Sequence, residues 1–410
     1  MHIYYLYIVF LRTLEVLYHT KHFYRHMKIL VVVPDMLLGG VTSSAINFCK
    51  ECQKRGNEVD ILVMDGTESN IPEVNQIGLK RPALLWNLSA KQLKNKSLIA
   101  KIGLAAVAII KKITNHFELW LPLVFHGFKI KGSYDVAVAY RQCAPCYYFT
   151  LKCVNARIKI AMIHGDLNFM RSTNTWDKYF PYFNKISCVS KAVTEGFKQK
   201  FQSVAEKFTT IYNMFDVEDI QGKALQTSPY SVNPSVVNII TVSRHENCHK
   251  KVDRVVKASA ELRKQDVENF HWYVVGDGPD FDYNCELANE LGVSDLITFC
   301  GAMENPFALQ SKCDFSVLLS ATEAYGMAVI ESQILGKPII AMQYPALNEI
   351  MQDEYNGLIA EQTVFSLTQC LKKLIENERL RKILTENVQK DRYSNNIAYQ
   401  QFIDAVQTDN

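Results

Sequence analysis

Apolar residues in this chain fall in short unbroken runs, separated by stretches with helical spacing. In the first half the runs cover 28–33, 59–64, 134–140, 158–163, 186–189 and 208–212. In the second half they cover 237–242, 270–275, 297–299, 315–319 and 339–341. A strand that lacks apolar–polar alternation is buried on both faces, as in a parallel sheet. The pattern therefore predicts an α/β protein with two doubly wound domains.

The alternation of strands and helices lapses once, in a polar stretch near the middle of the chain. We place a linker there, at 216–236, between an N-terminal domain at 27–215 and a C-terminal domain at 237–390. We expect residues 391–410 to form a helix that packs back on the N-terminal domain. Residues 1–26 differ in pattern from the rest of the chain, so we interpret them as an extension, with Met27 as a candidate initiator.

Composition limits the classes of function. The chain has 410 residues, 48% of them apolar and 21% charged, as in a globular protein with a large core. A net charge of +3 does not indicate a nucleic-acid partner. The 11 cysteines include two pairs with CxxC spacing, Cys49/Cys52 and Cys143/Cys146. We interpret these as core residues in a reducing cytosol, and we predict no metal site.

The stretch after the apolar run 315–319 carries two carboxylates, Glu323 in a loop and Glu331 inside a predicted helix at 326–335. A helix that starts at the carboxyl end of a parallel strand directs its free N–H groups at the ligand crevice. Phosphate would then bind the backbone of Ala324, Tyr325, Gly326 and Met327. Glu331 would accept the ribose hydroxyls, and Glu323 a group beyond the phosphate. A solvated helix face and an N-cap are the plainer alternatives.

Other polar candidates also follow predicted strands. Gly39-Gly40 follows the first strand, and His164 follows the strand at 158–163. Arg244 and Lys250 come after 237–242, where they are placed to neutralise a diphosphate. Unrelated solvated residues would not collect at strand ends in this way, although each residue taken singly has a structural explanation.

Residues 80–131 carry ten basic residues against one acid, Glu118. Leu98, Ile102, Ala105 and Ile109 recur at helical spacing within this segment. A basic amphipathic helix can bind an anionic membrane surface, whereas the alternative is a core-facing helix with a solvated basic face.

The second half resembles the retaining glycosyltransferase family 4, which has the GT-B fold of two facing Rossmann-like domains. VVGDGP at 274–279 resembles the glycine-rich loop of that family, and EAYGMAVIE resembles its Glu-x(7)-Glu motif at Glu323 and Glu331. Arg244 and Lys250 match its basic pair, and Lys337-Pro338 fits a turn of the family. In the first half Gly39-Gly40 and His164-Gly165-Asp166 are similar to its glycine and histidine loops, so the resemblance covers roughly 27–400.

The resemblance implies a role for each matching residue. Arg244 and Lys250 would neutralise the leaving diphosphate, and His164 would reach the sugar from the other domain. Glu323 and the backbone of 324–327 would hold the transferred sugar and its phosphate, with Glu331 on the ribose. The backbone from Gly301 to Met303 would meet the base, and Gly278 belongs to the glycine-rich loop. The resemblance implies neither a metal nor another cofactor.

Two residues depart from the family pattern. Lys251 stands where the family usually has glycine after the lysine, and Ala324 where it often has glycine after the first glutamate.

We therefore expect an enzyme that transfers a sugar from a nucleoside-diphosphate sugar to a glycan or lipid-linked glycan, in capsule or lipopolysaccharide synthesis. We expect it in the cytoplasm, peripheral to the membrane through 80–131. The alternatives are a non-catalytic nucleotide-sugar- or glycan-binding partner with the same fold, and a sugar-nucleotide epimerase.

Overall fold

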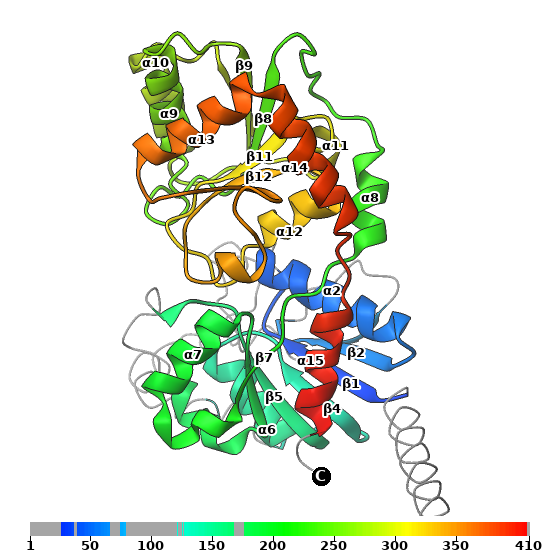
Figure 1. Cartoon of the computed structure of the whole chain (residues 1–410). Helices are drawn as coiled ribbons and strands as arrows, with labels where there is room; N and C mark the ends of the chain where they lie inside the picture. Colours follow the sequence, from blue (N-terminus) through cyan, green and yellow to red (C-terminus); the bar gives the residue numbers. More distant parts are fainter. Residues whose placement is uncertain are drawn as a thin grey trace, which may run out of the picture. The chain divides into compact units, whose positions relative to one another are not determined.

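The computed structural model describes residues 26–36, 39–65, 74–78, 121, 125, 127–167 and 176–407. They form two compact units, which Figure 1 shows with the chain coloured along its length. Unit 1 takes the described residues up to Val189, with Val193–Phe215 and the segment from Asn395. Unit 2 takes Ser190–Ala192 and Asp216–Ser394.

Unit 1 is built on a seven-stranded parallel sheet in the order β3-β2-β1-β4-β5-β6-β7. Its strands are β1 (Lys28–Val33), β2 (Glu58–Val63), β3 (Asn75–Gly78), β4 (Tyr134–Ala139), β5 (Ala156–Ile163), β6 (Lys185–Cys188) and β7 (Phe208–Thr210). Its helices include α2 (Gly40–Lys54), α6 (Ala144–Cys153), α7 (Lys191–Lys200) and α15 (Asn396–Gln407).

The last helix of the described chain, α15, packs on unit 1. The ring of Phe402 meets the ring of Phe48 on α2 edge to face, with centroids 5.0 Å apart. Arg55 donates a hydrogen bond to the Asn396 side chain at 2.6 Å. Both Phe48 and Phe402 are buried, so α15 completes the core of a unit that begins more than 300 residues earlier in the chain.

Unit 2 is built on a six-stranded parallel sheet in the order β10-β9-β8-β11-β12-β13. Its strands are β8 (Val237–Val242), β9 (Phe270–Val275), β10 (Ile297–Gly301), β11 (Phe315–Leu318), β12 (Ile339–Met342) and β13 (Gly357–Ala360). Its helices are α8 (Val217–Ala224), α9 (Asp253–Arg263), α10 (Phe281–Glu290), α11 (Phe307–Gln310), α12 (Met327–Ile334), α13 (Val364–Glu376) and α14 (Glu378–Lys390).

Successive strand residues in unit 2 enter different hydrophobic clusters. Ile239 and Val317 pack in one cluster with residues of α9 and α13. Their neighbours Ile240 and Leu318 pack in two other clusters. Since side chains alternate across a strand, both faces of this sheet are covered. That double burial explains why its strands appear in the sequence as unbroken apolar runs.

Both sheets change direction at their first strand. β1 lies between β2 and β4, and β8 lies between β9 and β11. In open α/β sheets the ligand crevice lies at the carboxyl ends of the strands, at such a switch point. The fold thus marks the loops after β1 and β4 in unit 1, and after β8 and β11 in unit 2.

Some expectations from the sequence meet a different outcome, and others fall outside the described residues. Residues 216–236, expected to be a linker, include α8 and belong to unit 2. The strands β3 and β13 were not predicted: β3 has a single large apolar residue, Ile77, and so forms no apolar run, and β13 is an apolar run of three residues, 358–360, that was not singled out. Residues 1–25, and nearly all of the basic segment 80–131, lie outside the described residues. Within the described part, no helix combines the length and apolarity needed to cross a bilayer.

Candidate active site

The loop after β8 carries Arg244 and Lys250, the two residues predicted to bind the diphosphate. The N–H groups of His249 and Lys250 donate to the carbonyl of Glu246, at 3.2 and 2.8 Å, and close a turn. Arg244 precedes this turn with a side chain 67% exposed, and its Nη1 lies 3.9 Å from the Glu246 carboxylate. Arg244 is therefore loosely held and open to an anion in solution.

Lys250 and Glu323 join the two loops at the switch point of unit 2. Lys250 Nζ donates to Glu323 Oε1 at 2.6 Å. Ser320 Oγ donates to the same oxygen at 2.6 Å. Lys250 comes after β8 and Glu323 after β11, the two strands between which the order reverses. Two side chains that the sequence separates by 73 positions thus share one hydrogen-bonded cluster.

Backbone geometry fixes the start of α12. Gly326 precedes the helix with φ +96°, a left-handed conformation that L side chains rarely adopt. A Cβ there would lie 1.9 Å from the hydroxyl of Tyr344, which donates to the carbonyl of Tyr325 at 3.1 Å. Glycine is required on both grounds. Residues 324–327 lead from Glu323 into the helix N-terminus, where N–H groups and the helix dipole favour an anion.

Glu331 lies in the second turn of α12 and is partly buried. Among the described residues, its carboxylate has no hydrogen-bond or ion-pair partner. Desolvation raises the pKa of this carboxyl to about 7. Keeping a partly buried carboxyl ionised without a hydrogen-bond partner costs free energy. A ligand with two adjacent hydroxyl groups would lower that cost by donating hydrogen bonds to it.

The predicted glycine-rich loop after β9 lies against the loop after β8. A Cβ on Gly276 (φ +140°) would meet the backbone oxygen of Ser243 at 1.9 Å. A Cβ on Gly278 would meet the carbonyl oxygen of His245 at 2.4 Å. The two glycines therefore allow the two loops to pack closely against each other. Gly278 thus allows its loop to approach the backbone of His245, and its contribution to ligand binding stays a prediction.

The end of β10 carries the predicted base-binding backbone. Gly301 has φ +68°, and its carbonyl accepts a hydrogen bond from the N–H of Gly276 at 2.8 Å. Met303 is partly buried and packs beside the cluster of Ile240 and Tyr273. The glycine-rich loop and the β10 end are thus tied together at the carboxyl edge of the sheet.

The remaining predicted residues belong to unit 1. Gly39 precedes α2, whose first residue is Gly40, and a Cβ on Gly39 would meet nothing within 4 Å. His164 follows β5, with its ring 4.9 Å from that of Tyr140. Its Nε2 is buried and has no hydrogen-bond partner in the described part of the chain. Desolvation, with a smaller effect of Arg141, lowers the pKa of His164 to about 4, so the ring is neutral at pH 7.

Sequence reasoning missed an ion pair in unit 1. Arg141 Nη1 donates to both carboxylate oxygens of Asp35, at 3.0 and 2.9 Å. Asp35 follows β1 and Arg141 follows β4, the strands at the switch point of this unit. Arg141 directly follows the predicted strand 134–140, as His164 follows its own strand, and Asp35 comes one residue later, after Pro34. Position alone therefore offered a signal for each residue, but not for their pairing. Ser320 and Tyr344 were missed because their roles depend on contacts that the sequence does not reveal.

Comparison with known proteins identifies the class of unit 2. Residues 232–391 match the family described as glycosyl transferases group 1. An uncharacterized glycosyltransferase of Methanocaldococcus jannaschii is 27% identical over 256 residues, 59% of this chain and 67% of the relative. The N-acetyl-alpha-D-glucosaminyl L-malate synthase of Bacillus anthracis is 25% identical over 260 residues, 61% of this chain and 67% of the relative.

A third relative and one solved structure extend the comparison. The relative is the N-acetylgalactosamine-N,N'-diacetylbacillosaminyl-diphospho-undecaprenol 4-alpha-N-acetylgalactosaminyltransferase of Campylobacter jejuni, 27% identical over 205 residues, 50% of this chain and 54% of the relative. HepE of Anabaena, in complex with UDP and glucose, covers 93% of this chain and all of that chain, with a TM-score of 0.67 and 18% identity. This structural likeness confirms the GT-B fold that the sequence predicted.

Proposed function

We propose a donor, an acceptor and residue roles from the premise that this chain is a glycosyltransferase, whose residues 232–391 form a glycosyl transferases group 1 domain. The reaction is transfer of a sugar, with retention at the anomeric carbon, from a nucleoside-diphosphate sugar. The acceptor is a glycan or lipid-linked glycan of a cell-surface polysaccharide. Membership of family 4 in particular stays a prediction.

The contact between Lys250 and Glu323 carries the proposal. It puts a cation, a carboxylate and the approach to the α12 N-terminus at the switch point of one sheet. A sugar nucleotide carries groups that complement these: hydroxyls on the sugar and two negatively charged phosphates next to it. Arg244 and Lys250 neutralise the diphosphate, and the backbone of 324–327 binds it further.

The leaving group determines what the cations do. The bond between the anomeric carbon and the diphosphate oxygen breaks, and its electron pair stays on that oxygen. Arg244 and Lys250 stabilise this developing charge. The acceptor hydroxyl attacks from the face that the diphosphate leaves, and its proton passes to the departing phosphate oxygen. This role needs no metal cofactor, because side-chain cations supply the positive charge.

Carboxylates and the neutral histidine position the donor. Glu323 accepts the hydrogen bonds of Lys250 and Ser320 on Oε1, so Oε2 is the oxygen that we assign to sugar hydroxyls. Glu331 accepts from the ribose, and the backbone of 301–303 meets the base. His164 contributes a hydrogen bond to the sugar from unit 1 as a neutral ring, and Gly39-Gly40 gives the donor close access to backbone.

The name of one relative supports the proposed acceptor and cellular location. The Campylobacter jejuni protein is named for a diphospho-undecaprenol substrate, which is a lipid. A lipid-linked acceptor is met at a membrane surface, and the ten basic residues of 80–131 suit an anionic one. We therefore propose that the enzyme works in the cytoplasm, peripheral to the membrane.

The test begins with donor binding. HepE was solved with UDP, so UDP is the first nucleotide to try, followed by GDP and ADP. A nucleotide at ten times its dissociation constant should stabilise the protein by about 1.4 kcal/mol. Slow hydrolysis of the matching sugar nucleotide without acceptor, and transfer with it, would support the enzyme.

Arg244→Ala should weaken the stabilisation by nucleotide and slow the hydrolysis, whereas Arg263→Ala, at a surface ion pair with Asp295, should change neither. Nucleotide binding without any turnover would instead favour a non-catalytic partner. Interconversion of free sugar nucleotides would favour an epimerase.

A further inference from the structure

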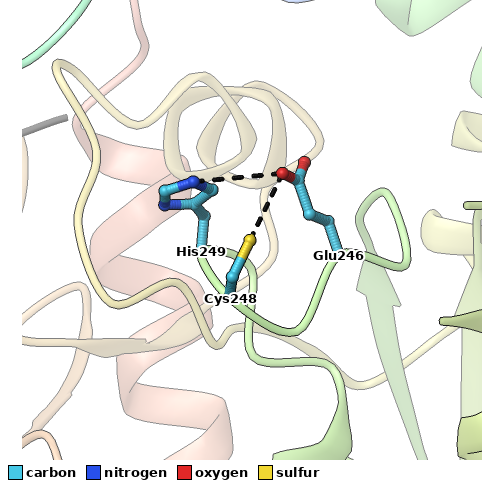
Figure 2. A group of neighbouring side chains, drawn as sticks. All are labelled: Glu246, Cys248 and His249. Atoms are coloured by element: carbon cyan, nitrogen blue, oxygen red, sulfur yellow. Dashed lines mark hydrogen bonds and ion pairs between the residues drawn. The ribbon is translucent and has the colours of Figure 1, made fainter. Parts of the chain in front are cut away.

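The turn between β8 and α9 gathers three different metal-binding side chains. Glu246, Cys248 and His249 each offer one ligand atom, and these atoms all lie within 4.8 Å of one another. Figure 2 shows the three side chains directed toward one another, with Glu246 Oε1 between the other two. Cys248 Sγ lies 3.4 Å from that oxygen, and His249 Nε2 lies 3.9 Å from it.

These separations can be compared with those around a tetrahedral zinc ion. Zn–S bonds of about 2.3 Å and Zn–O or Zn–N bonds of about 2.0 Å, at tetrahedral angles, separate the ligand atoms by roughly 3.3–3.6 Å. The sulfur–oxygen pair has that spacing, at 3.4 Å. The nitrogen–oxygen pair is wider, at 3.9 Å, and the sulfur–nitrogen pair lies within 4.8 Å, so the His249 side chain would have to move closer to the other two to bind a shared ion. We propose that Glu246, Cys248 and His249 bind one Zn²⁺ ion or a similar borderline-soft divalent cation, with water in the fourth position.

The chemistry of the ligand set favours zinc over magnesium or calcium. Thiolate and imidazole select borderline-soft metals, whereas magnesium and calcium prefer oxygen ligands. The charges also balance, because one thiolate and one carboxylate neutralise a divalent ion. A neutral site adds no repulsion toward Arg244 and Lys250, which stand on either side of the turn. Glu246 faces Arg244 through its other oxygen, Oε2, so the two contacts need not compete.

Neighbouring residues anchor the backbone of the turn. The N–H of Asn247 donates to Asp280 at 2.6 Å, and its side-chain amide donates to Asn284 at 2.9 Å. The carbonyl of His249 accepts from the N–H of Ala321 at 2.8 Å. Asn247 thus faces the protein, while its neighbours on both sides present the ligand atoms. Ligands on an anchored turn lose less entropy when they bind a metal.

The proposed ion is separate from the proposed sugar transfer, in which Arg244 and Lys250 supply the positive charge. Its role is to hold the turn that carries both cations. Metal binding can therefore be measured without any substrate, and its failure would leave the proposed function untouched.

Cobalt provides the direct measurement, because tetrahedral Co²⁺ absorbs visible light and a thiolate ligand adds a charge-transfer band in the near ultraviolet. The full chain, reduced and stripped of metal, is titrated with Co²⁺ and then with Zn²⁺. We expect one Co²⁺ per chain with a thiolate band, displaced by one equivalent of Zn²⁺.

Cys248→Ser should remove the thiolate band, and His249→Ala should weaken binding at least tenfold. Cys285→Ser is the matched control, since Cys285 lies on α10 outside the cluster, and it should bind as the wild type does. Circular dichroism establishes that each variant is folded. A thiolate band that persists in folded Cys248→Ser, or no band in the wild type, would overturn the proposal.

Discussion

Lys250 Nζ and Glu323 Oε1 lie 2.6 Å apart, across the two strands where the sheet of unit 2 reverses its order. An ion pair at this place has two explanations. It could fasten two loops together, or it could hold a cation ready for a diphosphate. Truncation of Lys250 tests the second explanation, because Lys250 carries the charge that a leaving group needs.

We expect Lys250→Ala to lower kcat by about 10²–10³-fold, as removal of one preorganised charge stabiliser does in other enzymes. Lys257→Ala is the matched control, because Lys257 pairs with Asp253 on the surface of α9 and should leave kcat unchanged. Steady-state transfer assays with folded variants give the answer. Equal turnover in Lys250→Ala and wild type would contradict the assigned role.

Glu331 should reduce stability at high pH. Its folded pKa is raised to about 7, so between its unfolded value near 4.5 and pH 7 the folded state binds more protons than the unfolded state. The carboxyl therefore costs little stability at low pH, and its cost grows between about pH 4.5 and 7 and levels off above pH 7. Glu331→Gln should raise stability by on the order of 2 kcal/mol at pH 8.5 and by little at pH 5.

Denaturant unfolding at the two pH values measures this difference. Because the same carboxylate is assigned to the ribose, Glu331→Gln should also weaken nucleotide binding. A variant that is no more stable at pH 8.5 than wild type would show that the carboxylate has a partner in solution.

Lys251 occupies a backbone conformation that suits glycine. Its φ is +52°, and a left-handed conformation costs a non-glycine residue roughly 1–2 kcal/mol. The family that the sequence resembles usually has glycine at this position. Removal of the strain in Lys251→Gly should raise the free energy of unfolding by about 1 kcal/mol. The measured gain should be smaller, because glycine also makes the unfolded chain more flexible.

Lys264→Gly serves as the control for Lys251→Gly, because Lys264 has φ −61° and gains nothing from glycine. A destabilised Lys251→Gly variant would show that the lysine side chain makes a contribution larger than the strain.

The start of α12 offers a test with two separable parts. Gly326→Ala should destabilise the protein by more than about 1 kcal/mol, from its positive φ and from the clash with Tyr344 Oη. Tyr344→Phe removes the hydroxyl. The double variant should therefore lose the destabilisation that the clash causes, while the destabilisation from the positive φ remains. Thermal unfolding of the two single variants and the double variant completes the cycle. Full additivity would exclude the clash.

Sequence patterns were sufficient for the architecture and for placing several candidate residues of unit 2 in neighbouring loops. Unbroken apolar runs marked buried parallel strands, and the strand-end rule selected Arg244, Lys250 and Glu323, which lie in loops at one switch point. The ion pair between Lys250 and Glu323 was not predicted, because a sequence does not reveal which side chains meet across 73 positions.

Other features were beyond local reasoning for a similar reason. Asp35 and Arg141 follow strands 106 positions apart in sequence, and only the strand order makes them neighbours. The cluster of Glu246, Cys248 and His249 is compact in sequence, but the sequence analysis, which predicts no metal site, did not single it out. Its significance depends on side-chain directions, which spacing alone does not fix.

The return of α15 to unit 1 has a consequence for the order of assembly. Phe48 is covered by Phe402, and the carboxylate of Glu51 accepts a hydrogen bond from Asn395 at 2.9 Å. A ribosome makes the partners of these two residues only after all of unit 2 has been translated. The portion synthesised first is thus the portion whose core closes last, and a nascent chain arrested near residue 394 should expose Phe48 to chaperones or proteases.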